Sequence, residues 1–168
     1  AMREYTGVVY HNAHQTVGYQ DIPVSLQKLV DNGVQIVKLQ EAASMYIPGV
    51  TQEKVDALQT FAKTIYLSQT CQKKDGKMTW FLNLEDAFED WYKNPGPREW
   101  RTHFHVPVFL TELGHGFGTT RFGLEQALAF HKKTPLSTHL EIETYTWDVL
   151  PDHLKTGDIV EYVTREID

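Results

Sequence analysis

The sequence predicts an α/β protein with about five parallel strands, crossover helices between them and one hairpin. Short apolar runs alternate with segments whose apolar residues recur at helical spacing. The length of 168 residues excludes a complete eight-unit α/β barrel. One βαβ unit needs about 30 residues and a whole barrel about 250. The chain is therefore either an open sheet or part of a barrel.

The first 70 residues predict alternating strands and helices from their apolar runs and helix-end residues. Asp21 is a suitable N-cap, Pro23 fits the first turn of the next helix, and Gly33 stands where that helix should stop. Thr51 is the expected cap of the following helix. In chain order we expect a strand over 6–10, a helix over 22–31, a strand over 34–40, a helix over 51–63 and a strand over 65–70.

The rest of the chain continues this pattern after a hairpin. Asp75 and Gly76 form a typical tight turn, so the segment that follows them is expected to fold back as a strand. Pro107 must lie near a strand end because proline cannot donate to a ladder. We expect a strand over 77–82, a helix over 84–92, a strand over 102–110, a glycine-rich loop over 114–120, a helix over 121–132, a last main strand over 139–146 and a short helix over 158–166.

Composition restricts the functional class. A formal net charge of −6, without a basic run, argues against a nucleic-acid partner. No apolar run approaches the roughly 20 residues of a membrane span, so we expect no membrane partner. The single cysteine, Cys71, suits a reducing compartment. We therefore expect a soluble, cytoplasmic protein, and we interpret residues 1–2 as a cloning scar and not as part of a signal peptide.

Polar side chains follow or end several predicted strands, which is where α/β barrels place their catalytic groups. Residues two apart on a strand share a face because side chains alternate with period 2. Imidazole and carboxylate groups together suit Mn, Zn, Fe or Co, so we predict a polar pocket able to hold a divalent metal. The alternative for any one histidine is a hydrogen-bonded structural role. The candidates are His11 and His14 after the first strand, and the pairs Lys38 with Gln40, His103 with His105, and Glu141 with Glu143.

The glycine-rich loop before the helix over 121–132 has a second potential use. Thr119 or Thr120 can cap that helix, and backbone N–H groups at a helix N-terminus favour an anion such as phosphate. We therefore count both threonines as candidate substrate-binding residues. A mobile lid is the alternative interpretation of the same loop.

Five segments carry a resemblance to a known family: HNAHQ (11–15), VKLQ (37–40), YLSQ (66–69), RTHFHVPV (101–108) and HLEIETYTWDVLP (139–151). Together they resemble the C-terminal half of the EboE metabolite-traffic family, which is similar to the xylose-isomerase-like sugar phosphate isomerases and epimerases. Those proteins are TIM barrels with a divalent metal. The resemblance implies that residues 3–168 form a partial, half TIM barrel. A homodimer or a missing N-terminal half is expected to complete it, because half a barrel leaves sheet edges uncovered.

The resemblance also implies roles for individual residues. It makes His105 the metal-binding histidine, and Glu143 both a metal-binding carboxylate and the catalytic group that moves a proton. His14 matches the histidine of a D-x-x-H pattern that touches substrate. Lys38 would supply positive charge to a developing enediolate or a phosphate. The residues expected to line the substrate pocket are His11, Gln40, His103 and Glu141.

We predict a sugar (phosphate) isomerase or epimerase-like protein that acts by metal-assisted proton transfer on a polyol or carbonyl substrate. The alternative is a non-catalytic metabolite-binding or trafficking module on the same scaffold. It is favoured because His11 stands where the family has a metal-binding Asp, and because the aromatic content is 12%. A metal hydrolase of the amidohydrolase kind ranks third. In that class the His-x-His pair precedes the Lys, whereas Lys38 precedes His103 here.

Overall fold

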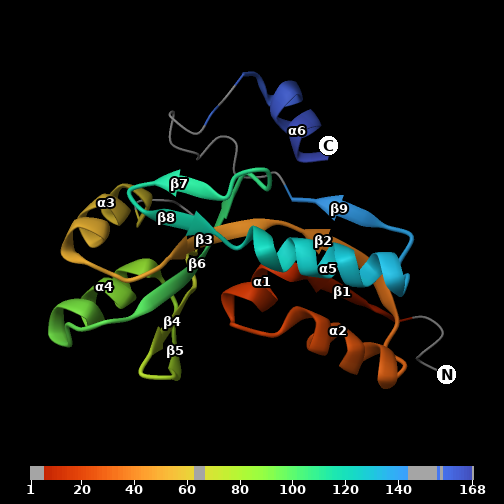
Figure 1. The fold of residues 1–168 in the computed structure, drawn as a ribbon, viewed down its shortest axis with the longest axis horizontal. Coiled ribbons are helices and arrows are strands. Elements are labelled where there is room, and N and C mark those ends of the chain that lie inside the picture. The colour runs from red at the N-terminus through yellow and green to blue at the C-terminus, as the bar shows by residue number, and fades with distance from the viewer. Residues whose placement is uncertain (1–5, 63–66, 144–154, 156, 168) are drawn as a thin grey trace.

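The computed structural model describes residues 6–62, 67–143, 155 and 157–167, and in them it contains two sheets (Figure 1). Sheet A has three parallel strands in the order β1-β2-β9, and sheet B has six antiparallel strands in the order β5-β4-β6-β3-β8-β7. The predicted half TIM barrel of about five parallel strands is therefore wrong. Only sheet A keeps the parallel arrangement that a barrel requires.

Sheet A carries helices on one face and polar side chains on the other. Tyr10 and Leu39 pack against α2 and α5 in one apolar cluster. The register places His11 beside Gln40 and Gln40 beside Glu141, so these three side chains form a row on the opposite face. The elements are β1 (Val8–His11), β2 (Ile36–Glu41), β9 (Leu140–Ile142), α2 (Ile22–Asp31) and α5 (Arg121–Lys133).

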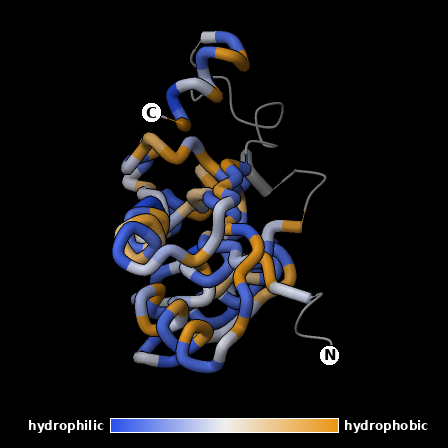
Figure 2. Tube along the Cα trace, turned by 90° about the vertical axis from the view of Figure 1, so that its right-hand side faces the viewer, coloured by the Kyte–Doolittle hydropathy of each residue, from blue (hydrophilic) through white to orange (hydrophobic). Residues whose placement is uncertain are grey.

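Sheet B contains the larger apolar core. Trp100 on β6 is fully buried with Met45 on β3, and Leu58 of α3 and Leu84 of α4 pack into the same cluster. Hydrophobic and hydrophilic stretches alternate along the chain, as amphipathic elements require (Figure 2). The elements are β3 (Ala43–Ile47), α3 (Gln52–Ala62), β4 (Thr70–Lys74), β5 (Lys77–Phe81), α4 (Leu84–Lys93), β6 (Glu99–Val106), β7 (Glu112–Gly114), β8 (Phe117–Thr119) and α6 (Ile159–Ile167).

The two sheets meet at Ala42, the one residue between β2 and β3. The buried amide of Asn12, the first residue of α1 (Asn12–Val17), donates to the carbonyl of Ala42 at 3.1 Å and accepts from its N–H at 2.9 Å. The other side of α1 meets α5 at Gly123, where a Cβ would lie 2.1 Å from Oγ1 of Thr16. These contacts fix the short helix α1 between the sheet junction and α5.

The sequence located most elements but not their directions. The five helices expected from capping and apolar spacing are present within one or two residues of their predicted bounds, and Asp75 and Gly76 do form the turn of a hairpin. The strand expected over 102–110 instead runs from Glu99 to Val106 and ends immediately before Pro107. It pairs antiparallel to both of its neighbours, β3 and β4. Helix α3 connects β3 to β4, and α4 connects β5 to β6. The two strands of each pair run in the same direction but are separated in the sheet by one antiparallel strand.

Three elements were not expected: α1, β3 and the β7–β8 hairpin that the glycine-rich loop forms. Residues 67–69 of the strand expected over 65–70 are not in a strand, and residues 65–66 lie outside the described residues. Residues 144–146 of the last predicted strand also lie outside them. In the described parts of the chain, none of the helices is long and apolar enough to cross a membrane.

Candidate metal centre

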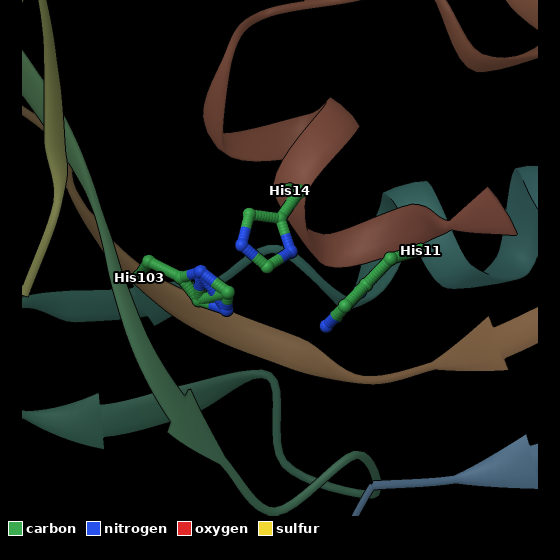
Figure 3. A group of neighbouring side chains, drawn as sticks. All are labelled: His11, His14 and His103. Atoms are coloured by element: carbon green, nitrogen blue, oxygen red, sulfur yellow. The ribbon is translucent and has the colours of Figure 1, made fainter. Parts of the chain in front are cut away.

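Four histidines and one glutamate converge from three separate parts of the chain. His11 ends β1 and His14 lies one turn later on α1, His103 and His105 lie on β6, and Glu143 follows β9. The rings of His11 and His14 point toward His103 across the space between α1 and β6 (Figure 3). We call these five residues the histidine–glutamate centre.

The donor atoms of the centre form two overlapping groups. His11, His14 and His103 make up one group, and His11, His105 and Glu143 make up the other; within each group the ligand atoms lie within 4.8 Å of one another. Nε2 of His11 is 2.6 Å from Oε2 of Glu143, and Nδ1 of His105 is 3.7 Å from the same oxygen. The two groups share His11, so the five side chains form one continuous site.

A bulge in β6 explains how two histidines of one strand reach the same point. Ser44 of β3 pairs with His105, but the next residue, Met45, pairs with Thr102, so β6 carries extra residues at this step. Bulges bend a strand and redirect its side chains. The rings of His103 and His105 consequently stack with centroids 4.6 Å apart, and their Nε2 atoms lie 2.6 Å from each other.

Burial keeps three histidines of the centre, His14, His103 and His105, neutral. Desolvation, reinforced by the neighbouring imidazoles, lowers the pKa of His105 to about 2 and that of His103 to about 3. The same two causes lower the pKa of His14 to about 4. These rings are therefore uncharged at neutral pH, and a neutral imidazole offers the lone pair that a metal ion requires.

The donor set fits a divalent transition metal. Imidazole nitrogens with a carboxylate oxygen suit Zn, Mn, Fe or Co. Among the described residues, the buried Nδ1 of His11 has no hydrogen-bond partner. The Nε2 atoms of His103 and His105 share one hydrogen bond, in which one nitrogen donates and the other accepts. In a purely structural histidine network, Nδ1 of His11 would also have a donor or acceptor of its own.

The remaining predicted polar residues of sheet A lie beside the centre. Oε2 of Glu141 is 2.8 Å from Nζ of Lys38, and Oε1 of Glu141 accepts from Nε2 of Gln40 at 3.1 Å. Gln40 pairs in register with His11, so this group continues the row that begins at the centre. The charge of Lys38 is balanced by Glu141, and its role toward a substrate stays a prediction.

Thr119 and Thr120 bond to their own chain. Oγ1 of Thr119 donates to the carbonyl of Leu110 at 2.8 Å and accepts from the N–H of Arg121 at 3.3 Å. Oγ1 of Thr120, which is fully buried, accepts from the N–H of Ser44 at 2.8 Å. Neither threonine belongs to the two donor groups of the centre. Their predicted contact with substrate is not tested by these bonds and stays a prediction.

The sequence singled out all five residues of the centre but assigned metal binding to only two of them, His105 and Glu143. His11, His14 and His103 were expected to serve substrate, whereas the structure brings their nitrogens into donor groups as well. The spacing of His11 and His14 was a usable signal, because residues three apart share one face of a helical turn.

No family model, no curated protein and no solved structure matches this chain. The resemblance to the EboE family therefore stays a prediction. The geometry of the histidine–glutamate centre is what indicates a function for this chain.

Proposed function

We propose that the histidine–glutamate centre binds a divalent transition metal and that the protein acts on a small hydroxyl- or carbonyl-bearing molecule by metal-assisted proton transfer. The observation that carries this proposal is the convergence of four imidazoles and one carboxylate whose ligand atoms lie within 4.8 Å of one another in each group. Sugars and sugar phosphates are the substrate class we expect. The reaction class is isomerisation or epimerisation.

The residues of the centre have different proposed roles, which follow from how exposed each side chain is. A bound divalent metal supplies a Lewis acid that polarises an oxygen of the substrate. The side chain of Glu143 is 22% exposed, so a substrate can reach it, and a carboxylate is a suitable general base for a carbon-bound proton. His105 is almost fully buried and supports the metal from the protein side. Beside them, Lys38 and Gln40 offer donors for hydroxyl or phosphate oxygens of the substrate.

A non-catalytic metabolite-binding module is the second candidate. Oε2 of Glu143 already lies 2.6 Å from Nε2 of His11, and Lys38 is already paired with Glu141. Groups that are paired within the chain are less available to move protons, which favours binding without turnover. The same residues serve both candidates, so only an assay of turnover separates them.

The first experiment measures metal content in the purified chain by plasma mass spectrometry. We expect close to one equivalent or more of Mn, Zn, Fe or Co in the wild type, and at least tenfold weaker metal binding in His105→Ala and in Glu143→Gln. His139→Ala is the matched control, because His139 is exposed and lies outside the centre. A wild-type chain that takes up none of these metals, even after dialysis against each of them, contradicts the proposal.

The second experiment tests the reaction with the metal-loaded chain. Sugars and sugar phosphates are incubated in deuterated water, and exchange of carbon-bound protons is followed by NMR. Exchange that is lost in Glu143→Gln supports the enzyme. Saturable binding without exchange supports the binding module.

Location and assembly are parts of the same proposal. We infer a cytoplasmic location, which the single free and buried Cys71 supports. We also infer a homodimer. The edge strands of the two sheets support it, since exposed edges invite pairing with another chain. Light scattering at several concentrations tests this, and a monomer throughout contradicts it.

A further inference from the structure

A second cavity lies on the helix-covered side of sheet A. Glu41 directly follows Gln40 on β2, so its side chain points away from the row that leads to the histidine–glutamate centre. The cavity has a volume of about 640 Å³ and is formed by β2, β9, α5, α6 and residues 108–109. None of the five residues of the centre lines it. It is therefore separate from the proposed metal site.

The walls of this cavity are mainly apolar. Its lining comes from α5, β9, α6 and the segment after β6, and it includes Phe109, Leu124, Leu128, Ile142 and Val163. Small-molecule sites commonly have volumes of about 300 to 1,000 Å³ and mainly apolar walls with a few placed polar groups. The size and lining thus fit a small molecule with a hydrocarbon body.

Among the described residues, no hydrogen bond accounts for the burial of the Glu41 carboxyl group beside this cavity. Its side chain is only 2% exposed, and both carboxyl oxygens lack a hydrogen-bond partner within the described part of the chain. A buried polar group without a partner is destabilising. The histidine–glutamate centre does not use this side chain, so a ligand that donates hydrogen bonds would remove the penalty.

The charges around the cavity favour a cation over an anion. The two arginines are already engaged. Arg121 donates from Nε to Glu125 at 2.9 Å and from Nη1 to the carbonyl of Phe109 at 2.8 Å, and the guanidinium of Arg165 lies 4.0 Å from the centroid of the Phe109 ring. A second buried carboxyl, that of Glu166, also lines the cavity. An anionic ligand would meet these carboxyl groups without a free guanidinium to balance it.

We propose that this cavity binds a small amphipathic amine, whose apolar body contacts the leucine- and phenylalanine-lined walls and whose ammonium group donates to Glu41. A primary ammonium has three donors and no acceptor, which matches a carboxyl group with two unused oxygens. Hydrogen bonds between charged groups are also shorter and stronger than those between neutral groups. A neutral alcohol of the same length would satisfy only one oxygen.

The test is isothermal titration of the full chain with octylammonium, with 1-octanol and octanoate as probes of equal length. EDTA is present throughout, so failure of the metal proposal cannot affect the result. We expect saturable binding of octylammonium, at least tenfold weaker binding of 1-octanol, and no detectable binding of octanoate. Equal affinity for octylammonium and 1-octanol, or no binding of octylammonium, overturns the proposal.

Variants locate the binding in this cavity. Glu41→Gln should weaken octylammonium binding at least tenfold and leave 1-octanol binding unchanged. Glu53→Gln, at an exposed position of α3, should change neither. Leu128→Trp places extra volume at the cavity wall without altering Glu41 and should weaken both probes. Circular dichroism verifies that each variant is folded. Octylammonium affinity that survives in both Glu41→Gln and Leu128→Trp refutes the assignment, and either variant alone suffices if the other does not fold.

Discussion

Replacing Asn12 by alanine should lower the free energy of unfolding by about 3 kcal/mol, because it removes two buried hydrogen bonds at once. The amide of Asn12 is fully buried and bonds to both the N–H and the carbonyl of Ala42, at 2.9 and 3.1 Å. Alanine leaves these two backbone groups without their partner at the junction of the sheets. A buried donor or acceptor left unmatched costs about 1 to 3 kcal/mol.

Urea denaturation at neutral pH measures this loss, with EDTA present so that bound metal does not contribute. Gln27→Ala is the control, because Gln27 bonds to Asp31 on an exposed face of α2 and its loss should change stability by no more than about 0.5 kcal/mol. Asn12 lies between His11 and His14, so Asn12→Ala should also weaken metal binding. A destabilisation smaller than about 1 kcal/mol, the typical net worth of a single hydrogen bond, would refute the role of Asn12 in fixing α1 to the sheet junction.

Three further predictions concern packing and protonation. Gly123→Ala should destabilise the protein by about 1 to 3 kcal/mol in urea, because the added Cβ would overlap Thr16 of α1, 2.1 Å from its Oγ1. Burial raises the pKa of Glu41 to about 7, so ionisation of this carboxyl group above pH 5 opposes folding. The stability of Glu41→Gln minus that of wild type should therefore be about 2 kcal/mol greater at pH 8 than at pH 5. Equal differences at both pH values would contradict this. Burial depresses the pKa of His105 in the folded chain, so the unfolded chain takes up the proton first as the pH falls. Metal-free wild type should therefore lose about 1 kcal/mol more stability than His105→Gln on acidification from pH 6.5 to 5.5. Parallel pH profiles for the two proteins would show that His105 ionises normally.

Local interactions made the helices predictable. Asp21 caps α2 by accepting from the N–H of Val24 at 3.0 Å, and Pro23 stands in the first turn, as the sequence indicated. Strand direction is not a local property. Alternation of strands and helices suggested parallel crossovers, but β2 and β3 are separated by Ala42 alone and belong to different sheets. Long-range pairing, which no single segment encodes, decides between the two arrangements.

The candidate site was predictable in its residues but not in its geometry. Strand-end histidines and carboxylates pointed to side chains that the structure brings together. The prediction placed them at the rim of a parallel barrel, whereas His103 and His105 come from an antiparallel strand. Their convergence depends on the bulge opposite Ser44 and Met45, and a bulge is set by pairing with another strand. The cavity beside Glu41 requires α6 and β9 to be placed together, which the spacing of residues along the chain does not reveal.

The late position of β9 in the chain determines when sheet A can be completed. β1 and β2 are neighbours in sequence and can pair early, but Gln40 of β2 meets Glu141, 101 residues further on. During synthesis at about 5 to 20 residues per second, one edge of β2 therefore stays unpaired for several seconds. Such an edge is open to pairing with other nascent chains.

Glu143 follows β9, so the carboxylate of the centre is also synthesised after the four histidines. If the centre binds a metal as proposed, full affinity would therefore be reached only after Glu143 has been synthesised.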